Sequence, residues 1–513
     1  MCGILFTNNS GEINTNEFMI ALYLMRHRGP DAPLGFYNYE NIMMGHNRLS
    51  IVDLHDRSNQ PFFSEDGRYV IVYNGEIYNY RELAKKYNVQ MKTSSDTELL
   101  LMLYINYGPI MLNWLNGMFA FIIFDTQMKK IFVARDRLGV KPLYYNVKGE
   151  NYTFSSEIKP LLHLLKNYSL DNIAIRQYKK MRSFFNNRTI YQEVKEFPPG
   201  CYMEGNVLYR YWENDYSDKQ PPSDEELKYL LESSVNYRKI ADVKIGSYLS
   251  GGLDSTIITG LAGVQHSWTV GFREMNEFQW SHLAANHFET EHHVIEMNKS
   301  QFIDLSKKLI REKAEPLSVP NEVLLYYMTM QAKKENTIIM SGEGADELFF
   351  GYDRIFKWAN SSEKWDLEQF SELYTYGSQK DLEIVEDAIQ PFLKWKKPEI
   401  IVAAFFQEAH LRGLLKRLDG ATMLNSVEAR SPFLDYRLVE RLSGVGYQYK
   451  AKDGVVKAPL KRVFKDHIPI EIAERKKVGF PVPLEQIFGV SFKGESYFDK
   501  WFNYNLEVLG ELL

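Results

Sequence analysis

The feature that most constrains the fold of this chain is a change in its strand pattern near residue 200. Before that point, five short apolar segments are punctuated by Gly, Asn and Asp; they are GILFTN, RYVIVYNG, FAFIIFD, KIFVARD and LYYNVKG. Clear helical patterns occur there only twice, around Glu17–Arg28 and Asp96–Leu115. Strands clustered in this way predict packed antiparallel sheets with a few helices, which is an α+β arrangement.

Farther along the chain, strands and helices alternate. Short buried strands are predicted at KIGSYLSGG, SWTVGF, HHVIEM and TIIMSG, and helical segments are predicted at STIITGLAG, SHLAANHF and EVLLYYMTMQAKKE. This alternation predicts a parallel α/β sheet, which the helical remainder after Gly351 would cover. A Pro- and Asp-rich passage from Pro198 to Leu227 marks the junction. We therefore predict two domains, residues 2–200 and 215–513.

Composition restricts the environment of the protein. The 513 residues carry a net charge of −5 and a pI near 6.2, which give no general attraction to nucleic acid or to an anionic membrane. The longest apolar stretch, Met118–Phe124, is far shorter than the roughly 20 residues of a membrane helix. No basic segment precedes the short GILF run, and two cysteines in this much chain fit a reducing compartment. We predict a cytoplasmic protein without nucleic-acid or membrane partners.

One of the two cysteines, Cys2, directly follows the initiator methionine. Removal of that methionine would place a thiol and a free α-amine on one residue. An α-amine has a pKa near 8, so that part of it is unprotonated at neutral pH and can accept the thiol proton. The alternative is that Cys2 is a small apolar residue at the start of an edge strand.

Polar segments in the first 100 residues favour the nucleophile. RHRGPD, GHNRLSIVD, YNGEIYNY and SSDTE follow Met-Cys-Gly in this order. Together they resemble the glutaminase domain of class II amidotransferases, which use an N-terminal nucleophile (Ntn), over most of the first 160 residues. The resemblance implies that Cys2 attacks the side-chain amide of glutamine, and that Asn74 and the N–H of Gly75 form an oxyanion hole.

The same resemblance implies a glutamine-binding set. Arg48 would hold the α-carboxylate, while Glu76 and Asp96 would receive the α-ammonium group. For Arg48 and Asp96 the alternative is a surface ion pair. The complete implied set is Arg48, Ile51, Val52, Asn74, Gly75, Glu76 and Asp96.

The segment YLSGGLDSTI, Tyr248–Ile257, joins a predicted strand to a predicted helix. Glycines, hydroxyls and a helix N-terminus suit a phosphate, yet the loop lacks the GK[ST] ending of a Walker A motif. It resembles the PP-loop of ATP pyrophosphatases. These enzymes let a substrate carboxylate attack the α-phosphorus of ATP, which gives an acyl-adenylate and pyrophosphate.

A second acidic loop, SGEGADELFFGY, follows the strand TIIM. The resemblance implies that Asp254 and Asp346 ligate Mg²⁺ on the pyrophosphate, as a hard cation prefers; the alternative is helix capping. It implies an ATP-binding set of Tyr248, Ser250, Gly251, Gly252, Asp254, Ser255, Val270, Ser341 and Gly342. Glu343 matches an acidic residue that would deprotonate ammonia or assist adenylate formation.

Later segments extend the likeness, namely NSVEARSPFLD, VVKAPLKRVF and RKKVGFPVP. Lys457 matches a lysine that contacts the reacting phosphate, whereas the basic run Arg475–Lys477 is equally compatible with a solvated face. A glutaminase followed by an adenylating domain is similar to the family of glutamine-dependent asparagine synthetases. The implied substrates are glutamine, aspartate and MgATP, the implied products are asparagine, glutamate, AMP and pyrophosphate, and ammonia would pass through an internal tunnel. Family analogy also suggests a homodimer.

Four alternatives stay open. An amidotransferase of the same architecture could amidate another carboxylate, such as a uronic acid in surface-glycan assembly. β-Lactam-forming relatives tend to lose the cysteine, which this chain keeps. A tRNA-modifying PP-loop enzyme would predict a basic face or a CxxC element, and a pure sensor would not need a nucleophile.

Three features lie outside the usual pattern or outside the predicted sites. Ala314 stands where many relatives have an acidic residue, and the chain after Trp501 is short. His292 and His293 are predicted to be structural, because no ligand set with zinc spacing accompanies them.

Overall fold

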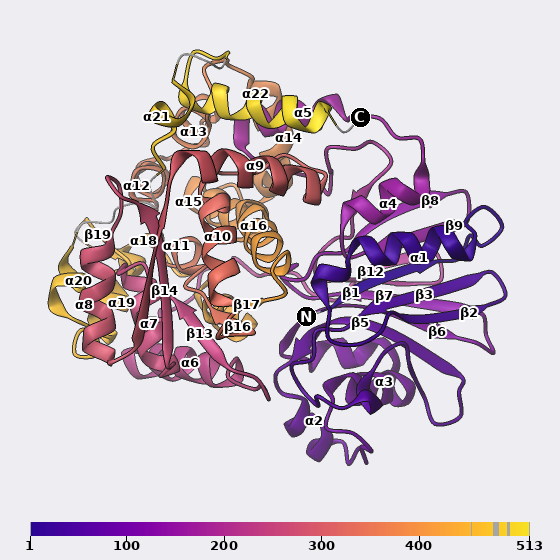
Figure 1. Cartoon of the computed structure of the whole chain (residues 1–513). Coiled ribbons are helices and arrows are strands. Elements are labelled where there is room, and N and C mark those ends of the chain that lie inside the picture. The colour runs from indigo at the N-terminus through magenta and orange to yellow at the C-terminus, as the bar shows by residue number, and fades with distance from the viewer. Residues whose placement is uncertain (1, 453, 476–481, 490–492, 512–513) are drawn as a thin grey trace.

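The computed structural model describes residues 2–452, 454–475, 482–489 and 493–511 (Figure 1). The chain forms an N-terminal half (2–210) and a C-terminal half (224–511), which lie side by side in Figure 1. The first is α+β with antiparallel sheets, and the second is built on a parallel sheet with a helical C-terminal part, as predicted. None of the described helices is long and apolar enough to cross a membrane.

Two six-stranded antiparallel sheets form the N-terminal half. The first has the strand order β10-β8-β9-β1-β3-β2, and its strands are β1 (Gly3–Thr7), β2 (Gly35–Tyr39), β3 (Ile42–Asn47), β8 (Tyr144–Lys148), β9 (Asn151–Ser155) and β10 (Lys195–Glu196). The second has the order β12-β11-β7-β6-β5-β4, and its strands are β4 (Phe62–Phe63), β5 (Tyr69–Ile77), β6 (Gly117–Asp125), β7 (Lys130–Arg135), β11 (Cys201–Glu204) and β12 (Val207–Arg210).

The sheets pack face to face, and helices cover their outer faces. Alternate residues of β5 and β6, including Val70, Val72 and Ile122, are fully buried between the sheets. The other set of alternate residues packs under α2 (Tyr80–Lys86) and α3 (Asp96–Tyr107). The helices α1 (Thr15–Leu24) and α4 (Ile158–Leu165) pack on the first sheet. Each buried large apolar side chain contributes about 1.5–3 kcal/mol to this four-layer core.

Both predicted helices of this half are shorter than expected. The first ends at Leu24 and continues as a 3-10 turn, Arg26–Arg28. The second ends at Tyr107, because Gly108 adopts a φ of 62° and Pro109 follows it in a 3-10 segment. The sequence patterns also missed α2, α4 and α5 (Asn172–Met181).

The C-terminal half contains a five-stranded parallel sheet with the order β15-β14-β13-β16-β17. Its strands are β13 (Ile245–Tyr248), β14 (His266–Phe272), β15 (Glu291–Met297), β16 (Ile338–Met340) and β17 (Glu428–Arg430). Helices α7 (Leu253–Ala262), α8 (Phe278–Phe288), α9 (Lys299–Lys313) and α10 (Asn321–Ala332) connect successive strands. The chain returns on opposite sides of β13, so the loops after β13 and β16 meet where parallel sheets usually bind ligands.

Further helices surround this sheet. They are α6 (Asp224–Tyr237), α11 (Ala345–Leu348), α12 (Asp353–Ser361), α13 (Leu367–Tyr374), α14 (Leu382–Ile389), α15 (Pro398–Phe405), α16 (Leu411–Met423), α17 (Tyr436–Leu442), α18 (Tyr447–Lys450), α19 (Ala458–Val463), α20 (Ile470–Glu474), α21 (Leu484–Phe488) and α22 (Tyr497–Gly510). A short hairpin joins β18 (Ala451–Lys452) to β19 (Val455–Val456).

The short C-terminal segment closes the core. In α22, drawn in yellow in Figure 1, Trp501 is fully buried and Asn505 accepts the N–H of Leu317 at 2.9 Å. Ala314 caps α9 with a φ of 53°, and its carbonyl accepts the Tyr191 hydroxyl at 2.7 Å. Ala314 and the short segment after Trp501, which both depart from the family pattern, therefore make specific contacts within the fold.

Polar contacts join the two halves. The N–H of Asp53 donates to Asp242 at 2.9 Å, Asn116 donates to Asp435 at 3.1 Å, and the Ser426 hydroxyl donates to the carbonyl of His27 at 2.6 Å. The edge strand β17 and helix α16 contribute further contacts beside Cys2, which form part of the site described next.

Candidate functional site

Cys2 is 7% exposed and immediately precedes β1. Its backbone N–H donates to Oδ1 of Asn74 at 3.0 Å, across the two packed sheets. Because the Cys2 nitrogen is a donor, it fixes Oδ1 of Asn74 as the acceptor and leaves Nδ2 as the donor of this amide. Asn74 Nδ2 is buried and has no hydrogen-bond partner among the described residues. Burial raises the pKa of the Cys2 thiol, while the Leu49 N–H and the Arg48 charge oppose the rise. A protonated thiol with an unused donor nearby suits a nucleophile that a base must activate.

Gly75 lies next to Asn74 in β5, opposite Phe119 of β6. A Cβ atom at Gly75 would lie 2.3 Å from the carbonyl oxygen of Met118, so a side chain does not fit there. The two predicted oxyanion residues are therefore consecutive in one strand beside Cys2.

Arg48 is buried in the loop that follows β3. Its Nη1 donates to the His55 carbonyl and to Oδ1 of Asn59, both at 2.8 Å, and its Nη2 donates to the Asp53 carbonyl. All these acceptors are neutral, and no carboxylate pairs with Arg48 within the described ranges. The alternative considered for Arg48, a surface ion pair, is thus not found among the described residues, and no carboxylate there competes with an anionic ligand for the guanidinium. The neighbouring Ile51 and Val52 are buried.

Glu76 and Asp96 are two buried carboxyl groups of the same site. Asp96 accepts hydrogen bonds from the Tyr73 hydroxyl and the Ile77 N–H, both at 2.8 Å. Burial raises the pKa of Glu76, and the charge of Asp96 raises it further; burial also raises the pKa of Asp96. One oxygen of Glu76 has no hydrogen-bond partner among the described residues. Burying two neighbouring carboxylates is unfavourable in free energy, and a primary ammonium group placed beside both of them would offset that penalty.

The C-terminal half supplies charge to this pocket through β17. Arg430 lies 3.3 Å from Glu76 and also forms an ion pair with Glu428. Although burial alone would raise it, the Arg430 and Lys141 charges lower the pKa of Glu428 to about 2. Strand β17 of the C-terminal half therefore contributes charged groups to the site around Cys2 in the N-terminal half.

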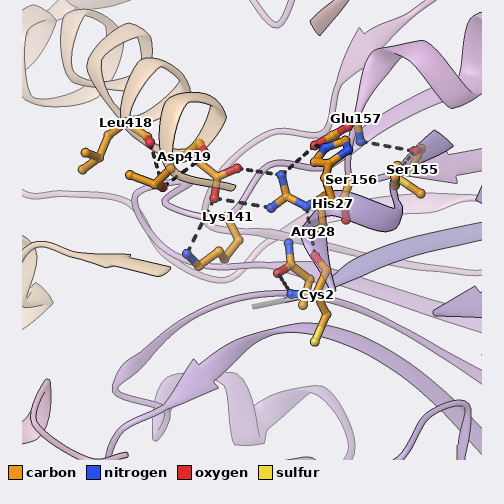
Figure 2. A network of polar contacts seen from close by, with 12 residues as sticks. Cys2, His27, Arg28, Lys141, Ser155, Ser156, Glu157, Leu418 and Asp419 are labelled. Carbon is orange, nitrogen blue, oxygen red and sulfur yellow. Dashed lines mark hydrogen bonds and ion pairs between the residues drawn. The ribbon is translucent and has the colours of Figure 1, made fainter. Parts of the chain in front are cut away.

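Arg28 forms a second connection between the halves (Figure 2). Its Nε donates to the Cys2 carbonyl at 3.0 Å, and its Nη1 donates to Glu157 at 3.0 Å and to Asp419 of α16 at 2.9 Å. The Lys141 ammonium lies 3.8 Å from the same Asp419. One buried guanidinium thus joins the backbone of Cys2 to α16 of the C-terminal half.

The predicted phosphate loop follows β13. Gly251 has a φ of 71°, and a Cβ there would lie 2.3 Å from the backbone of Trp280, so glycine is required. The Ser250 and Ser255 hydroxyls lie 3.0 Å apart, and the N–H of Gly252 donates to Ser250. Helix α7 starts after Gly252 without a side-chain cap, so its first N–H groups are available to an anionic ligand.

Lys457 lies between the two predicted Mg²⁺ ligands. Its ammonium is 2.5 Å from Asp254 and 2.7 Å from Asp346, and the lysine is 4% exposed. Although burial lowers it, the two carboxylates hold the pKa of Lys457 above its usual range. These carboxylates converge at the loops after β13 and β16, as hard oxygen ligands for a magnesium phosphate must. The residues present therefore fit the predicted cation.

Glu343 follows β16 and pairs with Arg417 of α16 at 2.6 Å. Arg417 also donates to Asn321 at 3.2 Å. Arg417 and Asp419 lie two residues apart in α16, so this helix contacts both Glu343 and the Arg28 bridge to Cys2.

A cavity of about 810 Å³ opens over these loops. It is lined by eight residues of the predicted ATP set and by Glu343, Asp346 and Lys457, whereas Gly251 does not line it. The eight are Tyr248, Ser250, Gly252, Asp254, Ser255, Val270, Ser341 and Gly342. Arg475 also lines the cavity, while the other two residues of its basic run lie outside the described residues.

Sequence reasoning missed several residues of these sites. Tyr73, Arg28 and Arg430 lie inside segments that carried the family resemblance, yet no role was assigned to them. Arg417 and Asp419 lie in a helical segment without a motif, and their charge does not distinguish them because Arg412 and Lys416 are charged residues of the same helix.

Comparisons with known proteins agree with both halves. The glutamine amidotransferase domain family matches residues 1–212, and the asparagine synthase family matches residues 226–493. Glutamine-hydrolyzing asparagine synthetase 1 of Bacillus subtilis is 30% identical, over 89% of this chain and 82% of that protein. Glutamine-hydrolyzing asparagine synthetase B of Escherichia coli is 29% identical, over 89% of this chain and 77% of that protein.

Among solved structures, glutamine phosphoribosylpyrophosphate amidotransferase from Bacillus subtilis is 17% identical over 51% of this chain and 64% of that one, with a TM-score of 0.32. That score is too low to bear on the architecture. The two family matches and the relatives that span most of the sequence define its membership. This chain belongs to the family of glutamine-hydrolysing asparagine synthetases.

Proposed function

We propose that this protein makes asparagine from aspartate, with glutamine as the nitrogen donor and ATP as the source of activation. The main support is that one chain of this family contains both a buried cysteine site and a cavity of about 810 Å³. Helix α16 connects them, because its Asp419 accepts from Arg28 and its Arg417 pairs with Glu343. The named relatives do not favour the alternative acceptor, a uronic acid.

Glutamine hydrolysis would begin at Cys2. With Met1 removed, the α-amine accepts the thiol proton, and the thiolate attacks the side-chain amide carbon of glutamine. Asn74 Nδ2 and the Gly75 N–H donate to the oxyanion, and each such donor commonly lowers the barrier by ~3 kcal/mol. Collapse of the intermediate expels ammonia and leaves a thioester, which water cleaves to glutamate. The hydrogen bond from Cys2 N to Asn74 supports this assignment because it orients the amide.

The two charged groups of glutamine would each be recognised by residues of the opposite charge. Arg48, held by neutral acceptors, binds the α-carboxylate of glutamine. Glu76 and Asp96 bind its α-ammonium group, which restores the charge balance of the buried pair. Ile51 and Val52 form the apolar wall of the same pocket.

Activation of aspartate would take place in the large cavity. The phosphate loop and α7 hold the pyrophosphate portion of ATP, and Lys457 contacts the reacting phosphate. The β-carboxylate of aspartate attacks the α-phosphorus, and pyrophosphate leaves. Mg²⁺ held by Asp254 and Asp346 would neutralise phosphate charge. Glu343 accepts a proton from ammonia as it attacks the acyl-adenylate, and AMP leaves.

Ammonia would move between the sites inside the protein. A cavity of about 40 Å³ between the halves is lined by Arg28 and Glu157 on one side and by Lys416 and Asp419 on the other. It can hold one molecule of the size of water or ammonia. Its place beside the Arg28 bridge supports internal transfer.

We also propose a division into domains, an oligomeric state and a location for the protein. The division into a glutaminase domain (2–200) and a synthetase domain (215–513) is supported by the break between β12 and α6, although β11 and β12 pair with the sheet of the N-terminal half. A homodimer follows from family analogy, and light scattering tests it. Localisation in the cytoplasm is tested by fractionation.

The proposed function is tested by mass spectrometry of the Met-processed protein with glutamine, aspartate and MgATP. Asparagine and AMP should form in equal amounts, with at least as much glutamate, and ammonium chloride should replace glutamine. Glutamate without asparagine or AMP would reject aspartate as the acceptor, and uronic acids would then be tested.

A further inference from the structure

We propose that His266, Glu291 and His293 form a binding site for a divalent transition-metal ion, best suited to Zn²⁺. The site lies near the amino-terminal ends of β14 and β15. It adjoins the large cavity, because Trp268, which lines that cavity, stacks on His293. None of His266, Glu291 and His293 lines the cavity itself, so the group is not part of the predicted ATP set.

The three side chains place one ligand atom each within 4.8 Å of one another, and each imidazole approaches a different oxygen of Glu291. His266 Nδ1 lies 3.1 Å from His293 Nε2 and 3.6 Å from Glu291 Oε2, and His293 Nε2 lies 3.7 Å from Glu291 Oε1. A tetrahedral zinc ion with bonds of about 2.0–2.2 Å separates its ligand atoms by about 3.3–3.5 Å. An ion therefore fits among the three side chains if both oxygens of Glu291 face it, or if the carboxylate turns so that one oxygen approaches both imidazoles.

Strand geometry explains why these side chains meet. In the parallel register, His266 is opposite Glu291 and Trp268 is opposite His293. Alternate residues of a strand point to the same face, so all four lie on one face of the sheet. His292 points to the other face and contacts Ser267 and Ser281.

Two neighbouring side chains lie beside the imidazoles. A carboxylate oxygen of Glu335, which follows α10, lies 4.0 Å from His266 Nε2. This distance is longer than a hydrogen bond, and a closer approach would give His266 the carboxylate partner on its second nitrogen that metal-binding histidines commonly have. The ring of His293 stacks on Trp268 at 3.9 Å between centroids with an angle of 14°.

The donor set favours zinc over magnesium. Two imidazoles and one carboxylate suit Zn²⁺, whereas Mg²⁺ prefers oxygen ligands. Three protein ligands leave a fourth position for water. Since β15 is an edge strand, the ion would join it to β14 and resist its separation. The sequence did not indicate this metal site, because His266 is 27 residues from His293 and lies on the neighbouring strand.

The test is a Zn²⁺ titration of the full-length protein with a chelator of known affinity as competitor, in the Cys2→Ala background to remove the nucleophilic thiol. We expect that protein to bind one more Zn²⁺ equivalent than the same protein with His293→Ala or Glu291→Gln. Both positions are partly exposed, at 27% and 60% of their side chains, so these variants should fold. His287→Ala, at an exposed position outside the group, is the matched control.

Two readouts make the result decisive. Co²⁺ bound at the site should give visible absorption bands that His293→Ala abolishes and His287→Ala keeps. Saturating Zn²⁺ should raise the midpoint of thermal unfolding by about 3 °C in the parent protein and not in His293→Ala. Equal Zn²⁺ stoichiometry in the parent and in His293→Ala would overturn the proposal.

Discussion

The two sites of this protein balance their buried charges in opposite ways. In the cysteine pocket, Glu76 and Asp96 lie together with raised pKa values, and Arg430 contacts only one of them, at a distance of 3.3 Å. In the ATP cavity, Asp254 and Asp346 share Lys457, and Glu343 pairs with Arg417. In the first site two carboxyl groups share one arginine contact and can accept a cationic group of the ligand, whereas in the second these three carboxylates are paired with a lysine or an arginine.

This difference matches the proposed ligands. Glutamine carries an ammonium group and can complete the first pocket, while ATP is an anion and needs fixed positive charge in the second. The sites also differ in enclosure, since Cys2 is nearly buried, whereas the loops after β13 and β16 line an open cavity of about 810 Å³. Substitutions that affect one site and spare the other test the comparison.

The largest effect is expected for Cys2→Ala. Loss of the nucleophile should reduce glutamine-dependent asparagine synthesis by at least about 10³-fold. Synthesis from ammonium chloride should stay near the parent rate, because the ATP cavity is unchanged. Cys201→Ala, in β11, is the matched control and should keep both activities. Unchanged use of glutamine by Cys2→Ala would refute the assigned role.

Lys457→Met should have the complementary effect. It removes the cation between Asp254 and Asp346 and a donor to phosphate, so synthesis from glutamine and from ammonia should both fall by about 10²-fold or more. Basal hydrolysis of glutamine should persist. The exposed Lys465→Met serves as the control, and a selective loss of glutaminase activity would contradict the division of roles.

Asp419→Asn should affect the connection between the sites. It weakens the charged hydrogen bonds to Arg28, which hold the backbone of Cys2, and such bonds contribute about 1.5–3 kcal/mol. We expect glutamine-dependent synthesis to fall about 10-fold, with a smaller change when ammonia is supplied. The exposed Asp304→Asn is the control. Equal losses with both nitrogen sources would place the effect in the C-terminal half alone.

The smallest effect concerns pH. Burial raises the pKa of Asp96 to about 6, against hydrogen bonds from Ile77 and Tyr73 that lower it. Protonated Asp96 attracts the ammonium group less, so kcat/KM for glutamine hydrolysis should fall as the pH drops through about 6. Tyr73→Phe removes one lowering hydrogen bond and should move this fall to higher pH by less than about one unit. Tyr69→Phe, on the same strand, should leave it in place, and an unshifted profile in Tyr73→Phe would contradict the role of that hydroxyl.

Local sequence patterns predicted the strands that carry the sites. Apolar runs such as those of β5 and β6 are buried on both faces and are therefore easy to recognise. The strand β17 escaped prediction, because it is three residues long and two of them, Glu428 and Arg430, are charged yet buried. Its pairing with β16 and its contact with Glu76 depend on tertiary structure.

The same limit applies to the sites. Cys2, Asn74 and the phosphate loop stand in local motifs, and the structure brings the members of each set together. The bridge from Arg28 to Asp419 spans 391 residues, and no local pattern marks its second member. Hydrogen bonds between distant segments therefore account for most of what the sequence alone did not reveal.

The buried ion pairs at β17 have a consequence for how the protein unfolds. If the first 212 residues were produced alone, Glu76 would lose Arg430 and the Cys2 backbone would lose the Arg28–Asp419 anchor. Removing one partner of a buried pair commonly costs 3–5 kcal/mol, a large fraction of the stability of a domain. The halves should therefore melt together as one cooperative unit in calorimetry, and neither would serve as a transplantable module.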